Sequence, residues 1–443
     1  MTAGLNHHAI EAVVARAVDP RVGIIHDLRA IEPGPGAPRF FHYAAQLSNL
    51  RAFGWEGNLT LLEAGSATRQ AARASVLFDA LGCYAAAFHA PHELELYSYR
   101  HATKRSVAPD RLALFSDEQY AQEAFSFEPF TDATPVRWVP ATSLESGERS
   151  FVPAAAALLP YRARGETGEA AIQPPSSVGL ACACSREEAV RTAICDVIKH
   201  DALALCWNAR LSPPHVRVET LSDENYPLVE RFETIGRITA LNITLDTSVP
   251  TFLLCLESPA EAAPAMVFGS GCDPDPDRAF RLALDDLALA LHLCGDALEV
   301  RRRQADRLTV DHRLDRLAFW CAHAHRSHAA FLFASSERLA FEEVSGRIGA
   351  APADSRGLAA TVAAAGYEVF IVDLTTSDLR ELGVAAVRAI VPGLQPLFGN
   401  PREQALGGTR LGELPGRLGF RPEKRSPPDA VVPHPFVLKG IES

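Results

Sequence analysis

The chain has 443 residues, of which 47% are hydrophobic and 22% charged, and its formal net charge is −11 at pH 7. This composition is typical of a soluble globular protein with a large core, and it excludes the disordered class. The negative charge disfavours nonspecific binding to nucleic acid or to an anionic membrane surface, so we expect neither as a partner.

The N-terminus and the cysteines indicate the cellular compartment. The first residues lack the apolar segment of a signal peptide, and the sequence contains no run of about 18 apolar residues that could span a membrane. The nine cysteines are spread through apolar stretches without the spacing of a disulfide scaffold. We therefore expect reduced thiols and a cytoplasmic location.

The first half of the chain predicts a mixture of helices and strands. Apolar residues recur at helical intervals over residues 67–88, whereas residues 93–99 and 110–115 have the pattern of a strand pair. A further strand is predicted near residue 151, before a loop rich in proline and glycine. Residues 1–66 have no such clear pattern, and we interpret them as an irregular α/β portion.

A helix is predicted over residues 186–207, because Ser185 and Glu188 form an S-x-x-E capping box at its start. Further along this helix, three polar residues are spaced i, i+3 and i+4, which brings them to one face. They are Asp196, Lys199 and His200. Taken alone, this face could be a binding site, the remnant of one, or a solvated surface with one weak ion pair.

The second half of the chain also predicts a mixture of helices and strands. A helix begins at Asp275, which can act as N-cap with Pro276 at the first helical position. Strands are predicted at residues 215–221, 237–246, 251–258 and 266–272, a helix–strand unit at residues 358–376, and a strand that meets a Pro-Gly turn within residues 387–397. The Pro-rich tail is expected to be extended. No long linker divides the chain, so we expect one mixed α/β (α+β) unit with its core over residues 67–443.

Five stretches of the sequence together resemble the YcaO family, in particular the azoline-forming cyclodehydratases of ribosomal peptide natural products. They follow the family's order at compatible spacing, and the resemblance covers the chain from about residue 20 to its end. The stretches are residues 72–86, 176–202, 269–288, 370–399 and 432–436. The resemblance implies a YcaO-like fold, with helices and sheets around a nucleotide-type cleft.

The resemblance also implies a chemistry. Family members use ATP to phosphorylate a backbone amide oxygen after a neighbouring Cys, Ser or Thr side chain has attacked the carbonyl, and loss of the phosphate closes a thiazoline or oxazoline ring. The family's ATP site combines the patterns Ser-x-x-x-Glu-x-x-Glu-Arg, Glu-x-x-Glu-Arg and Glu-x-x-Gln. Such a site needs carboxylates for magnesium and cations for phosphate.

This sequence departs from all three patterns. The first becomes Ser75, Asp79, Gly82 and Cys83, the second Asp196, Lys199 and His200, and the third Asp286 and Leu289. The family's C-terminal Pro-x-Pro-x-Pro becomes Pro433-His434-Pro435-Phe436-Val437. By resemblance, the degenerate nucleotide-site positions are Ser75, Asp79, Cys83, Asp196, Lys199, His200 and Asp286. The candidate catalytic residues are Asp79, Asp196, Lys199, His200 and Asp286.

The departures oppose standard use of ATP and magnesium. Aspartate in place of glutamate withdraws the carboxylate by one methylene group, which magnesium tolerates poorly because it demands near-ideal octahedral distances. Gly82 and Leu289 offer no ligand, and Lys199 puts a cation among the presumed metal ligands. Cys83 removes a guanidinium, and His200 replaces another with a group that is mostly neutral at pH 7. We therefore expect no bound ATP, magnesium or other metal.

Three other patterns could indicate a metal site or a nucleophile, but a structural or surface role is favoured for each. Cys182 and Cys184 lack a second ligand pair at zinc-site spacing, and we interpret them as structural. The histidines at 323, 325 and 328 are irregularly phased in a polar stretch, which favours a surface. A nucleophilic Cys83 near His200 is conceivable, but a buried cysteine is more often a small hydrophobe.

The leading hypothesis is a divergent YcaO-type subunit of a peptide maturation complex. It would hold a Cys, Ser or Thr of a precursor peptide against the preceding carbonyl and promote cyclodehydration without standard ATP use. By resemblance to trifolitoxin-type systems, we expect a flavin-dependent azoline dehydrogenase carrying FMN as partner subunit, around a homodimer core. Two alternatives stay open: a catalytically silent scaffold that binds precursor and supports the dehydrogenase, and a conventional ATP-dependent cyclodehydratase.

Overall fold

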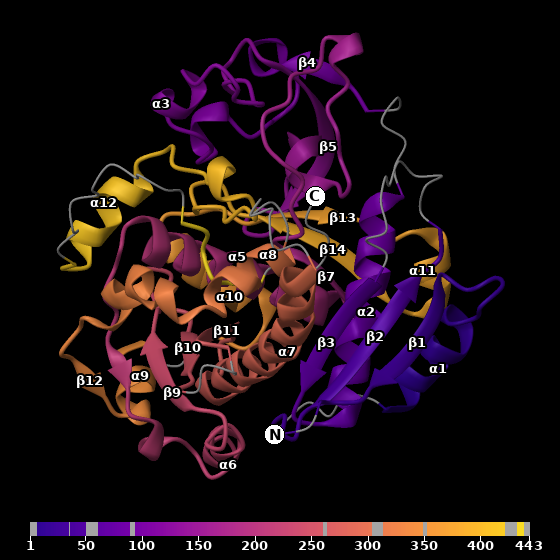
Figure 1. Ribbon diagram of the computed structural model, residues 1–443. Coiled ribbons are helices and arrows are strands. Elements are labelled where there is room, and N and C mark those ends of the chain that lie inside the picture. The colour runs from indigo at the N-terminus through magenta and orange to yellow at the C-terminus, as the bar shows by residue number, and fades with distance from the viewer. Residues whose placement is uncertain are drawn as a thin grey trace.

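In the part of the chain that it describes, the computed structural model contains three β-sheets and the helices that cover them (Figure 1). The structure describes residues 7–34, 36–49, 61–88, 94–259, 264–303, 313–348, 352–420 and 432–437. Within these residues, no helix is both long and apolar enough to span a membrane. The expected mixture of helices and sheets is confirmed.

The N-terminal residues form a regular antiparallel sheet, on which a long helix packs (Figure 1). The elements are α1 His7–Ala17, β1 Ile25–Ile31, β2 Phe41–Leu47, β3 Leu61–Ser66 and α2 Arg69–Ala87. The side chain of Thr68 caps α2 by accepting a hydrogen bond from the Ala71 N–H at 3.2 Å. Residues 1–66 were expected to be irregular, but those described are mostly helix and strand. Their alternation is hidden because β2 is buried along most of its length on both faces.

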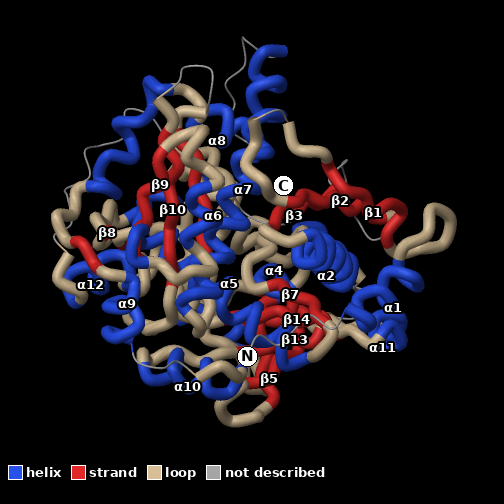
Figure 2. Tube along the Cα trace, turned by 90° about the horizontal axis from the view of Figure 1, so that it is seen from below, coloured by secondary structure: helices blue, strands red, loops and turns tan. Residues whose placement is uncertain are grey.

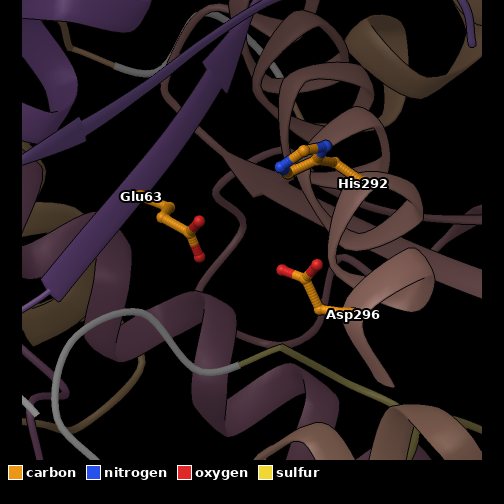
Figure 3. Close-up of side chains that lie close together, drawn as sticks. All are labelled: Glu63, His292 and Asp296. Carbon is orange, nitrogen blue, oxygen red and sulfur yellow. The ribbon is translucent and has the colours of Figure 1, made fainter. Parts of the chain in front are cut away.

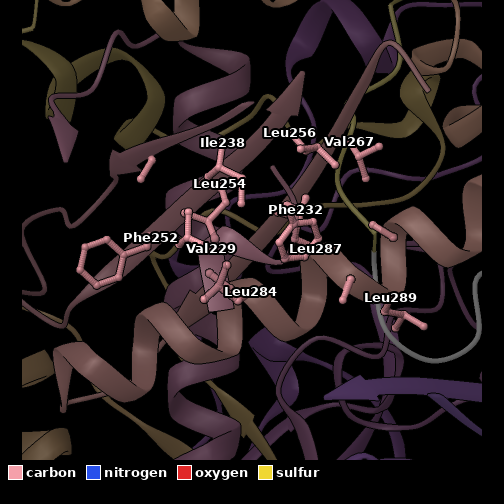
Figure 4. Close-up of a cluster of buried hydrophobic side chains, with 14 of the residues drawn as sticks. Val229, Phe232, Ile238, Phe252, Leu254, Leu256, Val267, Leu284, Leu287 and Leu289 are labelled. Atoms are coloured by element: carbon pink, nitrogen blue, oxygen red, sulfur yellow. The ribbon is translucent and has the colours of Figure 1, made fainter. Parts of the chain in front are cut away.

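The second sheet has five strands in the order β11-β10-β9-β8-β12, and helix α7, Pro276–Arg303, lies along it. The strands are β8 His215–Val216, β9 Arg237–Asn242, β10 Thr251–Glu257, β11 Met266–Cys272 and β12 Arg338–Leu339. Buried side chains such as Phe252, Leu254, Leu284 and Leu287 fill the space between sheet and helix (Figure 4). Burial of this apolar surface is the main force that holds α7 in place.

Two glycines of β11 set the distance between the sheet and α7. A Cβ atom on Gly269 would lie 2.3 Å from the Leu287 N atom, and one on Gly271 would lie 2.1 Å from the Ala279 carbonyl oxygen. Both contacts are far below van der Waals separation, so only glycine allows the two backbones to approach this closely. The Gly-Ser-Gly stretch therefore serves the close packing of β11 against α7.

The third sheet runs in the order β4-β5-β13-β14-β7, with β6 also paired to β5, and α5 packs on β14 and β7. These elements are β4 Leu96–Ser98, β5 Pro135–Ser143, β6 Arg149–Pro153, β7 Leu180–Ala183, α5 Arg186–Asn208, β13 Phe370–Asp373 and β14 Ala385–Ile390. Seen from below, α2 and α5 approach β7 from different sides (Figure 2).

Shorter elements complete the described chain. The α-helices are α3 Asp117–Tyr120, α4 Ala154–Ala157, α6 Tyr226–Glu230, α8 Arg313–Trp320, α9 Phe341–Ile348, α10 Ser355–Ala364, α11 Ser377–Leu382 and α12 Arg410–Arg417. The 3-10 helices are Tyr99–His101, Pro109–Arg111, Gly165–Thr167, Val218–Thr220, His323–Phe333 and Pro401–Glu403. Most of the Pro-rich tail lies outside the described residues, and residues 432–437 have no regular secondary structure.

Two strand predictions are wrong. The strand expected at residues 110–115 is instead a 3-10 turn at Pro109–Arg111 followed by loop, because a proline opens the segment and fixes a turn. The strand expected at residues 215–221 ends at Val216 and continues as a 3-10 helix. The helices expected at residues 67–88 and 186–207 are confirmed as α2 and α5.

Candidate functional site

A cavity of about 290 Å³ lies where α2, α5 and α7 meet the ends of β3, β7 and β11. All nine motif positions line it, including the eight at which the sequence departs from the family patterns. From α2 come Ser75, Asp79, Gly82 and Cys83, from α5 Asp196, Lys199 and His200, and from α7 Asp286 and Leu289. The structure therefore brings every predicted site residue to one place, and the polar face of α5 is not a solvated surface.

The junction between β3 and α2 is tied directly to α7 by Asp285. Its carboxylate accepts a hydrogen bond from the Ser66 hydroxyl at 2.9 Å and another from the Ala67 N–H at 2.8 Å. These contacts hold the start of α2 against α7 across more than 200 residues of sequence. Asp285 lines the cavity beside Asp286, and sequence analysis did not single it out.

Asp196 is the most heavily bonded carboxylate of the cavity. Its Oδ1 atom accepts from Lys199 Nζ at 2.8 Å, and its Oδ2 atom accepts from the Gly179 N–H at 2.8 Å. Burial favours the neutral acid, but Lys199, His200 and the Gly179 N–H outweigh it, and the pKa of Asp196 is lowered below its usual range. Asp196 is therefore an anion throughout the physiological pH range.

Lys199 is a buried cation whose side chain is 12% exposed. Burial alone would lower the pKa of its ammonium group, but the carboxylates of Asp196 and Asp286 overcome this effect and raise it. The ammonium group therefore stays charged and acts as a fixed positive charge associated with carboxylates from two helices.

The remaining polar groups are oriented by the backbone. His200 Nδ1 lies 2.7 Å from the Asp196 carbonyl oxygen, so it must donate, and in the neutral ring Nε2 carries the lone pair. On α7, Asp286 Oδ2 accepts from the Ser270 N–H at 2.9 Å and from the Ser270 hydroxyl at 3.3 Å. Both contacts of Asp286 cross from α7 to β11, and local sequence could predict neither of them.

Arg388, on β14, is a second buried cation, and it interacts electrostatically with Asp196 and Cys83 of the cavity. It is 3% exposed, and among the described residues its Nε and Nη1 atoms have no hydrogen-bond partner. Burial lowers its pKa to about 10, while Asp196 and Cys83 act in the opposite direction. Sequence analysis missed Arg388, although an arginine inside an apolar strand was a signal.

The cysteines near the cavity do not behave as nucleophiles. Burial, together with the negative charge of Asp79, raises the pKa of the Cys83 thiol to about 12, so the thiolate is scarce at neutral pH. Cys182 and Cys195 also line the cavity and are buried. Burial raises the pKa of the Cys182 thiol, and a hydrogen bond with Cys272 together with burial raises the pKa of the Cys195 thiol. A structural role for Cys83 is therefore favoured over the nucleophilic one.

The histidine stretch around His325 and the pair Cys182 and Cys184 were considered as metal sites, and the structure gives residues of both a packing role. The ring of His325 stacks on Phe319 with centroids 3.6 Å apart, and its Nδ1 atom donates to the Phe319 carbonyl oxygen at 2.7 Å. Cys182 packs in the cavity wall, while Cys184 is half-buried beyond it.

Comparison with known proteins agrees with this architecture. The family described as YcaO cyclodehydratase, ATP- and Mg²⁺-binding, matches residues 64–395. An uncharacterized protein of Methanothermobacter thermautotrophicus is 27% identical over 363 residues, which cover 80% of this chain and 86% of that one. A Rhizobium leguminosarum bv. trifolii protein, described as uncharacterized and lying in the tfuA 3′ region, is 26% identical over 66% of this chain and 68% of its own.

Solved structures share the fold. A heterocyclase in complex with substrate and cofactor has a TM-score of 0.78 and 21% identity, over 97% of this chain and 57% of that one. YcaO from Methanopyrus kandleri bound with AMPPCP and Mg²⁺ has a TM-score of 0.59 and 19% identity, over 84% and 86%. The Escherichia coli microcin synthetase McbBCD complex has a TM-score of 0.58 and 11% identity, over 86% and 91%. The chain spans just over half the length of the first structure. With the family match covering most of the chain, this protein belongs to the YcaO family.

Proposed function

We propose that this chain promotes cyclodehydration of Cys, Ser or Thr in a ribosomal precursor peptide, and that the Lys199 ammonium group serves where relatives use magnesium and ATP. Family membership supports the reaction class, and the fold is that of heterocyclases. The observation that carries the proposal is the ion pair of 2.8 Å between Lys199 Nζ and Asp196 Oδ1, inside the cavity that holds all the remodelled positions.

The donor set of the cavity suits a resident ammonium group better than magnesium. Magnesium needs oxygen ligands at near-ideal octahedral distances. Here one oxygen of Asp196 is bonded to an ammonium group and the other to a backbone N–H. Leu289 offers no ligand, and one oxygen of Asp286 is engaged by Ser270. A divalent ion would have to compete with a positive charge that is already in place, and we therefore derive no step through it.

The chain's own residues supply the chemistry. The thiol or hydroxyl of the peptide adds to the preceding carbonyl carbon, and its proton passes to His200 Nε2. The Lys199 ammonium group stabilises the resulting oxyanion, a type of stabilisation typically worth 10²–10³ in rate, or about 3–4 kcal/mol. The carbon–oxygen bond then breaks, and the oxygen leaves as water with the proton from His200 and the proton of the amide nitrogen, which closes the C=N bond.

Holding the two reacting groups together lowers the activation barrier further. A well-oriented intramolecular attack can remove about 7–11 kcal/mol of a barrier. Gly82 is consistent with such binding, because the nearest neighbour of a Cβ atom placed on it would be 3.6 Å away, at Cys182 Cβ. The glycine is thus not required for packing at this point, and it leaves room in the cavity wall.

The partners belong to the same proposal. A flavin-dependent azoline dehydrogenase carrying FMN would oxidise the azoline to an azole, and the chain would act as a homodimer within this complex in the cytoplasm. The related McbBCD structure is described as a complex, once with pro-MccB17 bound. This supports binding of a peptide and of partner subunits in general.

Reconstitution without nucleotide tests the proposal. The chain, its partner subunit and the precursor peptide are incubated with an ATP-depleting enzyme, and mass spectrometry follows the loss of one water per ring. We expect rings to form, and we expect Asp196→Asn to abolish them while complex formation on a sizing column is retained. As the matched control, Asp132→Asn at an exposed loop should modify peptide normally.

The outcomes separate the three hypotheses. Ring formation only with ATP would restore the conventional cyclodehydratase. Ring formation that survives Asp196→Asn, together with loss of modification only when surface changes break the complex, would establish the silent scaffold. Either result would overturn the proposed role of the cavity.

A further inference from the structure

A second cluster of polar side chains lies outside the cavity, between the N-terminal sheet and α7. Glu63 projects from β3, and His292 and Asp296 project from α7 towards it (Figure 3). One ligand atom of each residue lies within 4.8 Å of the others. None of the three is among the residues that line the cavity.

The fold explains why these side chains converge. Glu63 and Gly65 alternate along β3 and therefore share one face, and a Cβ atom on Gly65 would lie 3.3 Å from the Leu289 N atom of α7. The backbone of β3 thus approaches the helix closely at this face. His292 and Asp296 are spaced i, i+4, so they project from one side of α7.

His42 provides an independent observation beside the cluster. In β2 it is paired with Gly65, so it lies on the same face as Glu63, and its ring stacks on His292 with centroids 4.7 Å apart. It is 3% exposed, and among the described residues its Nδ1 atom has no hydrogen-bond partner. The His42 ring therefore packs against the ring of His292 at the edge of the cluster.

Two carboxylates and one imidazole meet in the cluster. Among the described residues, Arg313 contributes a cation, and its Nη2 atom is 3.6 Å from Glu63 Oε2. That contact engages one carboxylate oxygen and is longer than a hydrogen bond. One imidazole with two carboxylates is a donor set that suits zinc and other divalent transition metals, whereas magnesium and calcium prefer oxygen alone.

We propose that Glu63, His292 and Asp296 bind a divalent transition-metal cation of the zinc class, with water completing the coordination. Such an ion joins β3 to α7. Two and three residues beyond Glu63, the same strand places Gly65 and Ser66 in the cavity wall, to which α7 contributes Asp285 and Asp286. The metal would therefore stabilise the contact between β3 and α7, which positions these residues of the cavity wall. It takes no part in the proposed reaction.

Zinc titration of the full chain after chelator treatment tests the site. We expect one zinc per chain, bound at least about tenfold more weakly by Asp296→Asn and by His292→Gln. Asp110→Asn, an exposed aspartate in the 3-10 helix Pro109–Arg111, is the matched control and should bind as the unchanged chain does. Cobalt in place of zinc should give a spectrum without a thiolate charge-transfer band.

Two results would overturn the inference. If Asp296→Asn and His292→Gln bind zinc with the same affinity as the unchanged chain and the control Asp110→Asn, the cluster is an ion-pair network and not a metal site. A thiolate band with cobalt would assign the metal to cysteines instead. Both readouts are independent of peptide modification, so failure here is distinguishable from failure of the proposed function.

Discussion

Replacing Lys199 by glutamate is expected to lower peptide cyclodehydration at least about 100-fold, because it removes the ammonium group that stabilises the oxyanion. The same change places a third carboxylate beside Asp196 and Asp286. The variant should therefore gain a response to magnesium that the unchanged chain lacks. At a hundredfold excess over Kd, the ion would stabilise the variant by about 2.7 kcal/mol, visible as a rise in Tm. Modification rate and thermal unfolding with and without magnesium measure the two effects.

Lys199→Met separates the two effects. It removes the cation without adding a carboxylate, so activity should fall as in Lys199→Glu and magnesium should give no stabilisation. Lys104→Glu, at a lysine whose side chain is 39% exposed, is the control for charge reversal elsewhere and should change neither property. Full activity of Lys199→Met would remove the ammonium group from the mechanism.

The second large effect concerns stability. Arg410→Met is expected to lower the free energy of unfolding by about 3–5 kcal/mol, because it leaves two buried carboxylates without their cation. Arg410 Nη2 lies 2.6 Å from Asp201 Oδ2 and 2.7 Å from Asp246 Oδ1, and its side chain is 4% exposed. Denaturant unfolding measures the loss. Asp201 belongs to α5, so this network anchors the helix that carries Asp196.

Arg417→Met is the matched control for this loss. Arg417 belongs to the same helix, α12, and is exposed, so its replacement should change stability by no more than about 0.5 kcal/mol. Burial raises the pKa of Asp201, although Arg410 opposes the shift. Without Arg410 this carboxyl should take up a proton at higher pH, and the deficit of Arg410→Met should shrink as the pH falls. A loss below 1 kcal/mol would show that the network contributes little.

The sequence was most informative where the determinants are local. The capping box at Ser185 and the N-cap at Asp275 predicted the starts of α5 and α7, and helical spacing predicted α2. The i, i+3 spacing of Asp196 and Lys199 predicted their ion pair, because both residues lie on one helix. Resemblance to the family then predicted that the three helices share a cleft.

Other contacts that position the residues of the site join parts of the chain that are distant in sequence. Asp285 bonds to Ser66 and Ala67, and Arg388 on β14 interacts electrostatically with Asp196 on α5, so no local pattern could pair them. The N-terminal sheet was missed because β2 is buried on both faces and lacks alternation. The cluster around His292 requires β3 to meet α7, a pairing that only the folded chain shows.

Calorimetric titration of the purified chain with ATP and magnesium, alone and with its partner subunit, tests the central claim most directly. The Lys199–Asp196 pair predicts no magnesium-dependent heat of ATP binding, while the same complex still forms rings in the peptide. Micromolar ATP binding that requires magnesium and releases phosphate with peptide would contradict it, and would restore a conventional ATP-dependent cyclodehydratase.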